Sequence, residues 1–204
     1  MLKKLSLISV VTASAFAMHG VDININDKDL EFGANLDMGQ FVQTVEPNTV
    51  FVGARYLKGN EAHSDFNSND NAYYEANFLM QKPINNSGLT LGLGVKLNHT
   101  QCDIAGKTLN FTSVPLGVEA DYKLPVNSPV PLHLGGQLYY APEVLSMNDA
   151  KSFLESRINF DIEVIPNGKI TLGYRSLDTN YDYSGTTLNK NYNRSAYAGF
   201  KFNF

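Results

Sequence analysis

Histidines are the side chains best suited to acid–base catalysis, and the chain has four of them: His19, His63, His99 and His133. A hydrolytic site needs a nucleophile beside a base, or a pair of carboxylates, at one place in the fold. No histidine follows His133, so the C-terminal third of the chain offers no such base. His63 lies close to Asp65, but the surrounding polar stretch is typical of an exposed loop. We therefore predict that the chain is not an enzyme and has no catalytic residue.

The single cysteine, Cys102, excludes an intrachain disulfide and a cysteine-based metal cluster. Its neighbours in residues 99–103 supply too few ligands for a metal ion. The formal net charge is -4, and the charges are scattered along the chain. Since no basic stripe with interleaved aromatic residues occurs, a nucleic-acid partner is not expected. We predict no metal and no cofactor.

Charged side chains that alternate with apolar ones are the remaining candidates for function. In residues 154–164, for example, Leu154, Ile158 and Phe160 alternate with Glu155 and Arg157. Successive residues of a strand point to opposite faces, so such a strand has one apolar and one charged face. The pattern recurs along the chain and predicts that the following charged side chains line one interior: Arg55, Glu75, Lys96, Glu119, Asp121, Glu155, Arg157, Asp161, Glu163, Arg175 and Lys201.

The last ten residues identify the architecture that separates these faces. Phe200, Phe202 and Phe204 share one face of a terminal strand, and Phe204 is the final residue. An apolar face at a frayed terminus is unfavourable in water but suits a closed barrel in lipid, whose strand edges are all paired. The terminal aromatic resembles the signal for insertion of bacterial outer-membrane barrels. This predicts outer-membrane lipid and the barrel-assembly machinery as partners; a soluble edge strand or periplasmic β-barrel is the alternative.

The N-terminus predicts export from the cytoplasm. Lys3 and Lys4 precede a short apolar run, and Ala15 and Ala17 form an A-x-A cleavage site. Residues 1–17 are therefore expected to be a cleaved signal peptide, too short to span a bilayer as a helix. Residues 18–204 are the expected barrel domain.

Turn chemistry divides this domain into strands. Short turns are expected near 46–48, 83–88, 125–129 and 166–168, and longer polar loops near 59–71, 98–108, 142–152 and 178–190. This alternation is typical of transmembrane barrels, and it predicts an all-β, closed antiparallel barrel of about ten strands beginning at Val21, with eight as the alternative. The alternation slips near Thr112, which predicts a bulge that tolerates Pro115. Several tyrosines are expected at the membrane edges: Tyr56, Tyr73, Tyr74, Tyr122, Tyr139, Tyr140, Tyr174 and Tyr192.

The width of such a barrel limits its function. An interior of about eight strands is just filled by side chains, and buried charges of opposite sign are expected to pair. A salt-bridged, plugged interior that serves the envelope is thus one hypothesis. A narrow path for small polar solutes is the second, and an adhesin or partner-binding barrel acting through its loops is the third.

One stretch carries a family resemblance. Residues 138–146 read LYYAPEVLS, and Gly173, Tyr174 and Arg175 follow later. These motifs resemble the YfaZ family of bacterial outer-membrane proteins, best over about 138–180. The resemblance implies an outer-membrane barrel of a Gram-negative bacterium and supplies no activity and no catalytic residue.

The same stretch fits the rim of a barrel. Pro142 cannot donate to a strand ladder, so it is expected to end one. Residues 143–152 are then predicted to fold over the extracellular mouth as a lid that includes Pro142, Glu143 and Asp149.

Overall fold

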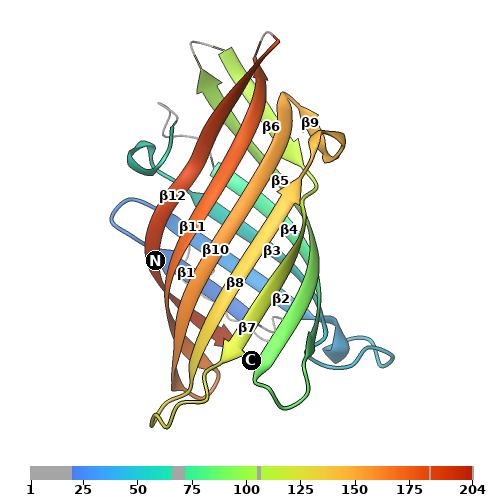
Figure 1. The fold of residues 1–204 in the computed structure, drawn as a ribbon, viewed down its shortest axis with the longest axis vertical. Helices are drawn as coiled ribbons and strands as arrows, with labels where there is room; N and C mark the ends of the chain where they lie inside the picture. Colours follow the sequence, from blue (N-terminus) through green and yellow to red (C-terminus); the bar gives the residue numbers. More distant parts are fainter. Residues whose placement is uncertain (1–19, 66–71, 105–106, 184, 204) are drawn as a thin grey trace, which may run out of the picture.

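The computed structural model describes residues 20–65, 72–104, 107–183 and 185–203. The described part of the chain is almost entirely β-structure (Figure 1). Three 3-10 turns, η1 (Met38–Gln40), η2 (Glu61–His63) and η3 (Glu143–Leu145), interrupt the strands. No helix in the described part is long and apolar enough to cross a membrane. The strands are β1 (Gly20–Ile25), β2 (Leu30–Asp37), β3 (Val50–Lys58), β4 (Ala72–Pro83), β5 (Leu89–Ile104), β6 (Lys107–Ser113), β7 (Leu116–Lys123), β8 (Leu132–Ala141), β9 (Ser146–Asn148), β10 (Ala150–Ile165), β11 (Gly168–Tyr183) and β12 (Thr186–Asn203).

Ten of these strands close into an antiparallel barrel. Each pairs with its neighbour along the chain, and β1 closes the ring by pairing with β12, with Gly20 opposite Asn203. Of the two remaining strands, β6 pairs with the second half of β5 on one edge and with β9 on the other. The prediction of ten strands with the first beginning near Val21 is therefore confirmed. We call the end that carries Gly20 and Asn203 the terminal end, and the opposite end the distal end.

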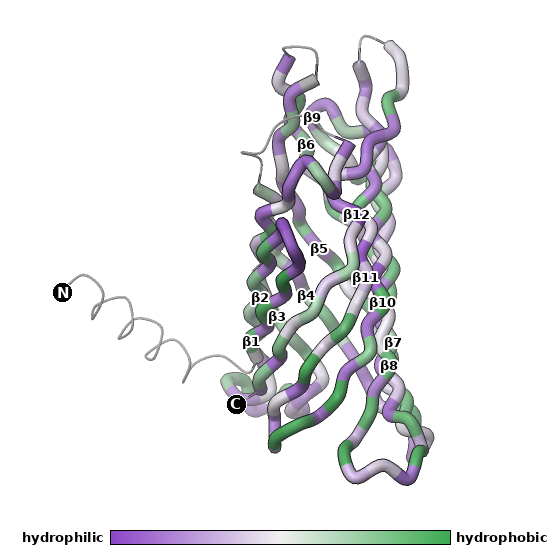
Figure 2. Tube along the Cα trace, turned by 90° about the vertical axis from the view of Figure 1, so that its left-hand side faces the viewer, coloured by the Kyte–Doolittle hydropathy of each residue, from purple (hydrophilic) through white to green (hydrophobic). Residues whose placement is uncertain are grey.

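The outer face of the wall is apolar because the alternating pattern holds along the ring. Leu93 is 70% exposed, and Ile23, Leu138 and Leu172 are each about half exposed. Figure 2 shows the hydrophobic and hydrophilic residues alternating along the strands. Two short turns, 84–88 and 166–167, and two longer connections, 38–49 and 124–131, close the terminal end. Asn48, Asn85 and Asn167 adopt positive φ angles of 63, 47 and 64° there. Asparagine tolerates this left-handed conformation, which explains its place in these turns.

The slip predicted near Thr112 marks a change of partner. β6 ends at Ser113 and β7 begins at Leu116, so the chain breaks at Val114 and Pro115. Before the break the chain pairs with β9, and after it with β8. The carbonyl of Pro115 still accepts a hydrogen bond from the Lys96 amide, 2.9 Å away. A proline fits here because its missing N–H falls between two ladders.

The wall is much taller on one side than on the other. β1, β2 and β3 stop well below the distal end, whereas β5, β6, β11 and β12 continue toward it (Figure 1). Two of the predicted polar loops are therefore wrong. Residues 98–104 lie in β5, and residues 178–183 and 186–190 lie in β11 and β12. We call the strands beyond the top of β1–β3 the distal extension.

In the distal extension the polarity of the two faces is reversed. Cys102, Leu109 and Phe111 face inward and are fully buried, while Gln101 and Thr108 face outward and are exposed. This is the pattern of a strand in water, with the apolar side packed and the polar side solvated. The polar residues read as loops in the sequence because their strands lack the outward apolar face that marks the lower wall.

Candidate functional site

A layer of paired charges crosses the interior. Glu31 of β2 receives the Nη1 of Arg157 at 2.8 Å and the Nη1 of Arg55 at 2.8 Å. Lys96 of β5 lies 2.8 Å from Glu155 and 3.3 Å from Glu75. We call these six residues the ionic layer: Glu31, Arg55, Glu75, Lys96, Glu155 and Arg157.

The ionic layer is continuous because Arg157 joins its two halves. The Nε of Arg157 is 2.6 Å from Glu155, while its Nη1 holds Glu31. The side chains of Glu31 and Glu155 have no exposed surface. Removing one partner of a buried ion pair costs about 3–5 kcal/mol, since the other charge stays buried. Each charged side chain of this layer therefore has a partner of opposite charge within the protein.

Asp29, in the turn between β1 and β2, holds the short side of the wall to the tall side. Its carboxylate lies 3.1 Å from Arg175 and accepts a hydrogen bond from Asn193 at 2.9 Å. The Asn60 amide and the Nδ1 of His63 lie 2.9 and 3.0 Å from it. Burial by itself raises the pKa of Asp29, but hydrogen bonds from Asn193 and Asn26 and the charge of Arg175 hold the pKa below its usual value. Asp29 therefore stays ionised and ties together β1, β11, β12 and the segment around η2.

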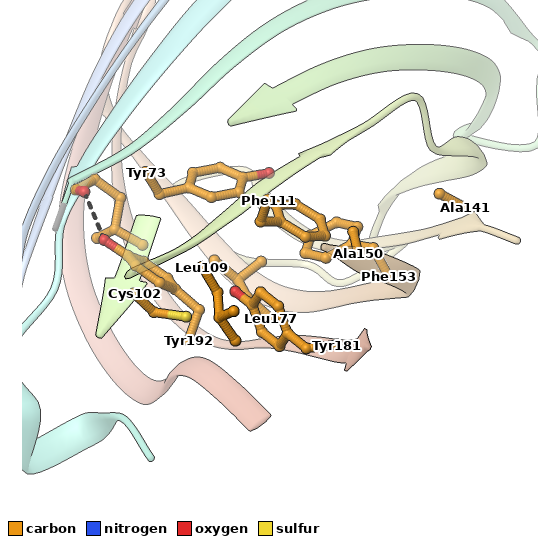
Figure 3. Close-up of a cluster of buried hydrophobic side chains, with 11 residues drawn as sticks. Tyr73, Cys102, Leu109, Phe111, Ala141, Ala150, Phe153, Leu177, Tyr181 and Tyr192 are labelled. Carbon is orange, nitrogen blue, oxygen red and sulfur yellow. Dashed lines mark hydrogen bonds between the residues drawn. The ribbon is translucent and has the colours of Figure 1, made fainter. Parts of the chain in front are cut away.

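An apolar layer lies on the distal side of the ionic layer. Figure 3 shows the side chains of the apolar layer. The Phe111 ring packs against Phe153 at 5.3 Å and against Tyr181 at 6.1 Å between centroids. Tyr192 lies 5.7 Å from Tyr73, and its hydroxyl donates to the Leu57 carbonyl at 3.3 Å. All members are buried: Leu57, Tyr73, Cys102, Leu109, Phe111, Ala141, Ala150, Phe153, Leu177, Tyr181 and Tyr192.

Tyr73 connects the two layers. Its ring belongs to the apolar layer, and its hydroxyl donates to Glu75 at 3.2 Å and accepts from Asn98 at 3.2 Å. Tyr73, Tyr139 and Tyr192 were predicted at the membrane edges. This was wrong, because all three are buried inside. Tyr74 and Tyr140, by contrast, are about half exposed on the outer face. Tyrosine serves both places because it has an apolar ring and a polar tip.

On the terminal side of the ionic layer the interior is hollow. A cavity of about 270 Å³ is lined by Asp22, Arg55, Glu75, Lys96 and Glu119, among others. A second cavity of about 110 Å³ shares Glu119, Gln81, Gln137 and Lys201 with it. We call the two cavities together the vestibule. It begins at the terminal end, where Gly20 and Asn203 line it, and reaches the ionic layer.

Of the remaining predicted charges, Lys201 and Asp121 line the vestibule, and the others lie outside its lining. Asp161 pairs with Lys201 at 2.9 Å. Asp121 and Glu163 flank His133 at 2.9 and 3.9 Å, and both are partly exposed. Arg175 lies 3.5 Å from Glu31 as well as beside Asp29. The structure thus brings the eleven predicted side chains into one interior, although in several separate groups.

Three carboxylates of the network, Glu31, Asp22 and Asp29, are absent from the eleven predicted lumen residues, although alternation with Leu30 and Phe32 assigns Glu31 to the inner face. Asp22 lies 3.4 Å from Arg55, and Asp29 holds Arg175. Asp22 is at the weakly patterned start of the first strand, and Asp29 is in a turn where alternation has no meaning. Alternation of residue types did not predict the position of Asp29. Its side chain lies inside the barrel because β1 and β2 are short.

The segment predicted as a lid forms part of the wall. Pro142 ends β8, and η3 and β9 follow it. β9 pairs with β6, and Asp149 accepts a hydrogen bond from the Asn110 amide at 2.9 Å. Glu143 is exposed, and Val144 is 86% exposed. Side chains of the apolar layer fill the distal interior, and the segment predicted as a lid contributes Ala150 to this layer and packs Leu145 of η3 against it.

The residues of the predicted insertion signal are only partly described. Phe200 is 41% exposed on the outer face, and its ring stacks on Phe202 at 6.4 Å. Phe204 and the signal peptide expected at residues 1–17 lie outside the described residues.

Histidines and other possible metal ligands are dispersed in the structure. His63 contacts Asp29, His99 lies 2.9 Å from Thr112, and His133 contacts Asp121. Within the described ranges, no three His, Cys, Asp or Glu side chains are grouped in a way that could hold a metal ion. The candidate site is therefore the interior itself, in which the vestibule, the ionic layer and the apolar layer follow one another along the barrel axis.

Comparison with known proteins places this barrel in a family. No match was found among curated proteins. A family model described as YfaZ precursor matches residues 3–204. The word precursor agrees with the export signal expected at the N-terminus, and the match confirms the resemblance seen in the sequence. Since it covers essentially the whole chain, the chain belongs to the YfaZ precursor family.

Proposed function

We propose that this chain is an outer-membrane barrel of the Gram-negative envelope that neither conducts solutes nor catalyses a reaction. A precursor family and a closed β-barrel indicate a secreted protein of membrane type. The apolar outer face supports lipid as its surroundings, since a barrel satisfies every backbone group within lipid. The terminal end then faces the periplasm, and the distal extension reaches outside the cell.

The observation that carries this proposal is the double closure of the interior. The ionic layer joins β2, β3, β4, β5 and β10 across the barrel, and the apolar layer fills the space beyond it. A solute that crossed would have to separate buried ion pairs and then pass a packed aromatic cluster. Both steps cost free energy, because separating a buried ion pair leaves unpaired charges and close-packed rings leave no space for a solute. A barrel of this kind serves as a stable structural component of the envelope, or it supports its distal extension outside the cell.

Planar-bilayer recording of the refolded protein tests the proposal. We expect no stable conductance steps from the wild-type chain, and none from Arg157→Ala, because the apolar layer still closes the interior. A triple variant, Arg157→Ala with Phe111→Ala and Phe153→Ala, removes material from both layers and is expected to conduct. Heat-dependent gel mobility establishes that each variant is folded and inserted.

Stable conductance steps from the wild type would overturn the proposal and favour a small-solute pore. A silent triple variant, shown to be inserted, would mean that other groups close the interior. The partner-binding alternative is tested separately by deleting the tip of the β11–β12 hairpin, residues 182–187, which leaves both layers in place. Loss of attachment to a surface without any change in conductance would favour that alternative.

A further inference from the structure

Glu119, on the wall of the vestibule, is held in an unusually specific way. Tyr139 donates a hydrogen bond to its Oε1 at 2.6 Å, and the Lys96 Nζ lies over the Tyr139 ring at 4.1 Å from the centroid. Tyr139 is 1% exposed and lies flat on the wall over Gly94 and Gly117. A Cβ at either glycine would overlap the Tyr139 ring or hydroxyl. These two glycines therefore make the space that fixes the tyrosine against the carboxylate.

Within the described part of the chain Glu119 has no ion-pair partner, unlike the other charged residues that line the larger cavity. Of the described lining residues, Arg55 pairs with Asp22 and Glu31. Lys96 pairs with Glu75 and Glu155, and Lys201 with Asp161. Each lining cation is thus engaged by at least one carboxylate. The hydrogen bond from neutral Tyr139 leaves the negative charge of Glu119 uncompensated.

The charge of the surrounding network has the same sign. Among the described residues of the ionic layer, the vestibule wall and the contacts of Asp29 and Lys201, eight carboxylates face five Lys and Arg cations. The carboxylates are Asp22, Asp29, Glu31, Glu75, Glu119, Asp121, Glu155 and Asp161, and the cations are Arg55, Lys96, Arg157, Arg175 and Lys201. An excess of negative charge beside a partly desolvated cavity attracts a positive ligand.

The remaining lining of the vestibule is polar and hydrogen-bonding. Asn77, Gln81 and Gln137 present amides, which donate and accept. The larger cavity, about 270 Å³, is smaller than the pockets that hold drug-sized ligands. It has more room than a bare ion needs, and no cluster of metal-binding side chains occurs in the described part of the chain. The site therefore suits a small organic cation that also carries a hydroxyl or carbonyl group.

We propose that the vestibule binds a small primary ammonium compound, with its ammonium group on Glu119 and its polar end on the amides around Gln81 and Gln137. The ligand enters from the terminal end and stops at the ionic layer. This inference does not depend on whether the barrel conducts, because the site lies on one side of the closure.

Calorimetric titration of the refolded full barrel domain in detergent micelles tests this proposal. The probes are ethanolamine, ethylene glycol and glycolate, which are similar in size and carry positive, zero and negative charge. We expect saturable binding of ethanolamine alone. Glu119→Gln keeps the acceptor for Tyr139 but removes the charge, so it is expected to weaken ethanolamine binding about tenfold or more, the loss of one charge-assisted hydrogen bond.

Asp182→Asn, in the distal extension and far from the vestibule, is the matched control and is expected to bind ethanolamine like the wild type. Circular dichroism and heat-dependent gel mobility show whether each variant is folded. The proposal is overturned if folded wild-type protein does not bind ethanolamine. It is also overturned if Glu119→Gln binds ethanolamine as tightly as the wild type, or if ethylene glycol or glycolate binds equally well.

Discussion

Glu31→Gln is the substitution that tests the ionic layer most directly. The Glu31 carboxylate faces Arg157 at 2.8 and 2.9 Å, Arg55 at 2.8 Å and Arg175 at 3.5 Å, and its side chain has no exposed surface. The three arginines keep other carboxylate partners, so none becomes wholly unpaired. They nevertheless repel one another once the central negative charge is gone. We expect the free energy of unfolding to fall by about 3–5 kcal/mol, the cost of removing one partner from a buried ion pair.

The assay is urea unfolding of the refolded protein in phospholipid vesicles, followed by circular dichroism and gel mobility. Tryptophan fluorescence cannot report it, because the chain has no tryptophan. Glu163→Gln is the matched control: its carboxylate is 31% exposed and 3.9 Å from His133, so its loss is expected to cost under about 1 kcal/mol. The reasoning is refuted if the two variants lose the same stability.

A double variant separates charge pairing from simple packing. Glu31→Gln combined with Arg157→Met removes one charge of each sign from the same contact. The two changes should not add, because the second relieves part of the imbalance left by the first. We expect a coupling free energy of about 1–3 kcal/mol. Additive losses would mean that Glu31 and Arg157 do not act as a pair.

Further predictions concern the apolar layer, the contacts of Asp29 and the packing of Tyr139 against Gly94 and Gly117. Phe111→Ala should lower the free energy of unfolding by about 3–5 kcal/mol, measured in the same urea assay, because a buried ring leaves a cavity. The pKa of folded Asp29 lies below its usual value of 3.8, so its stabilisation is complete above that pH and is lost as the pH falls through the folded value. Asp29→Asn should therefore flatten the acid limb of the unfolding curve; an unchanged limb would contradict this. Gly94→Ala should destabilise the barrel by displacing Tyr139, whereas Gly136→Ala, whose Cβ would meet only a carbonyl 3.7 Å away, should be tolerated; equal urea midpoints would count against a tight seat for Tyr139.

The lower wall is the part of the fold that sequence reasoning describes well. In β10, Ile158 and Phe160 face outward while Arg157 and Asp161 face inward, as their parity predicts. The prediction succeeds because an apolar outer face and a polar interior impose opposite demands on neighbouring residues. The phase slip at Pro115 was also informative, since it marks where β6 gives way to β7.

The strands of the distal extension were predicted as loops, and this error also has a physical reason. The outer face of the distal extension is polar and exposed, so the outward apolar residues that mark the strands of the lower wall are absent there. Tyr181 and Leu188 face inward and were counted with loop residues. In β12 a register shift opposite Leu177 and Asp178 also changes which residues face inward, so a period of two taken from the lower wall fails above it.

Alternation of residue types, a product of local backbone geometry, was enough by itself to determine that this chain is a closed barrel with an apolar outside and a charged inside. Tertiary structure alone decided which charges meet. Glu31 and Arg157 are far apart in the chain, as are Asp29 and Arg175, and they come together only because strand heights and register bring them across the interior. Strand heights and register also explain why no described cation pairs with Glu119. Periodicity assigns a side chain to a face, but the distances that pair one charge and leave another free depend on closure of the ring.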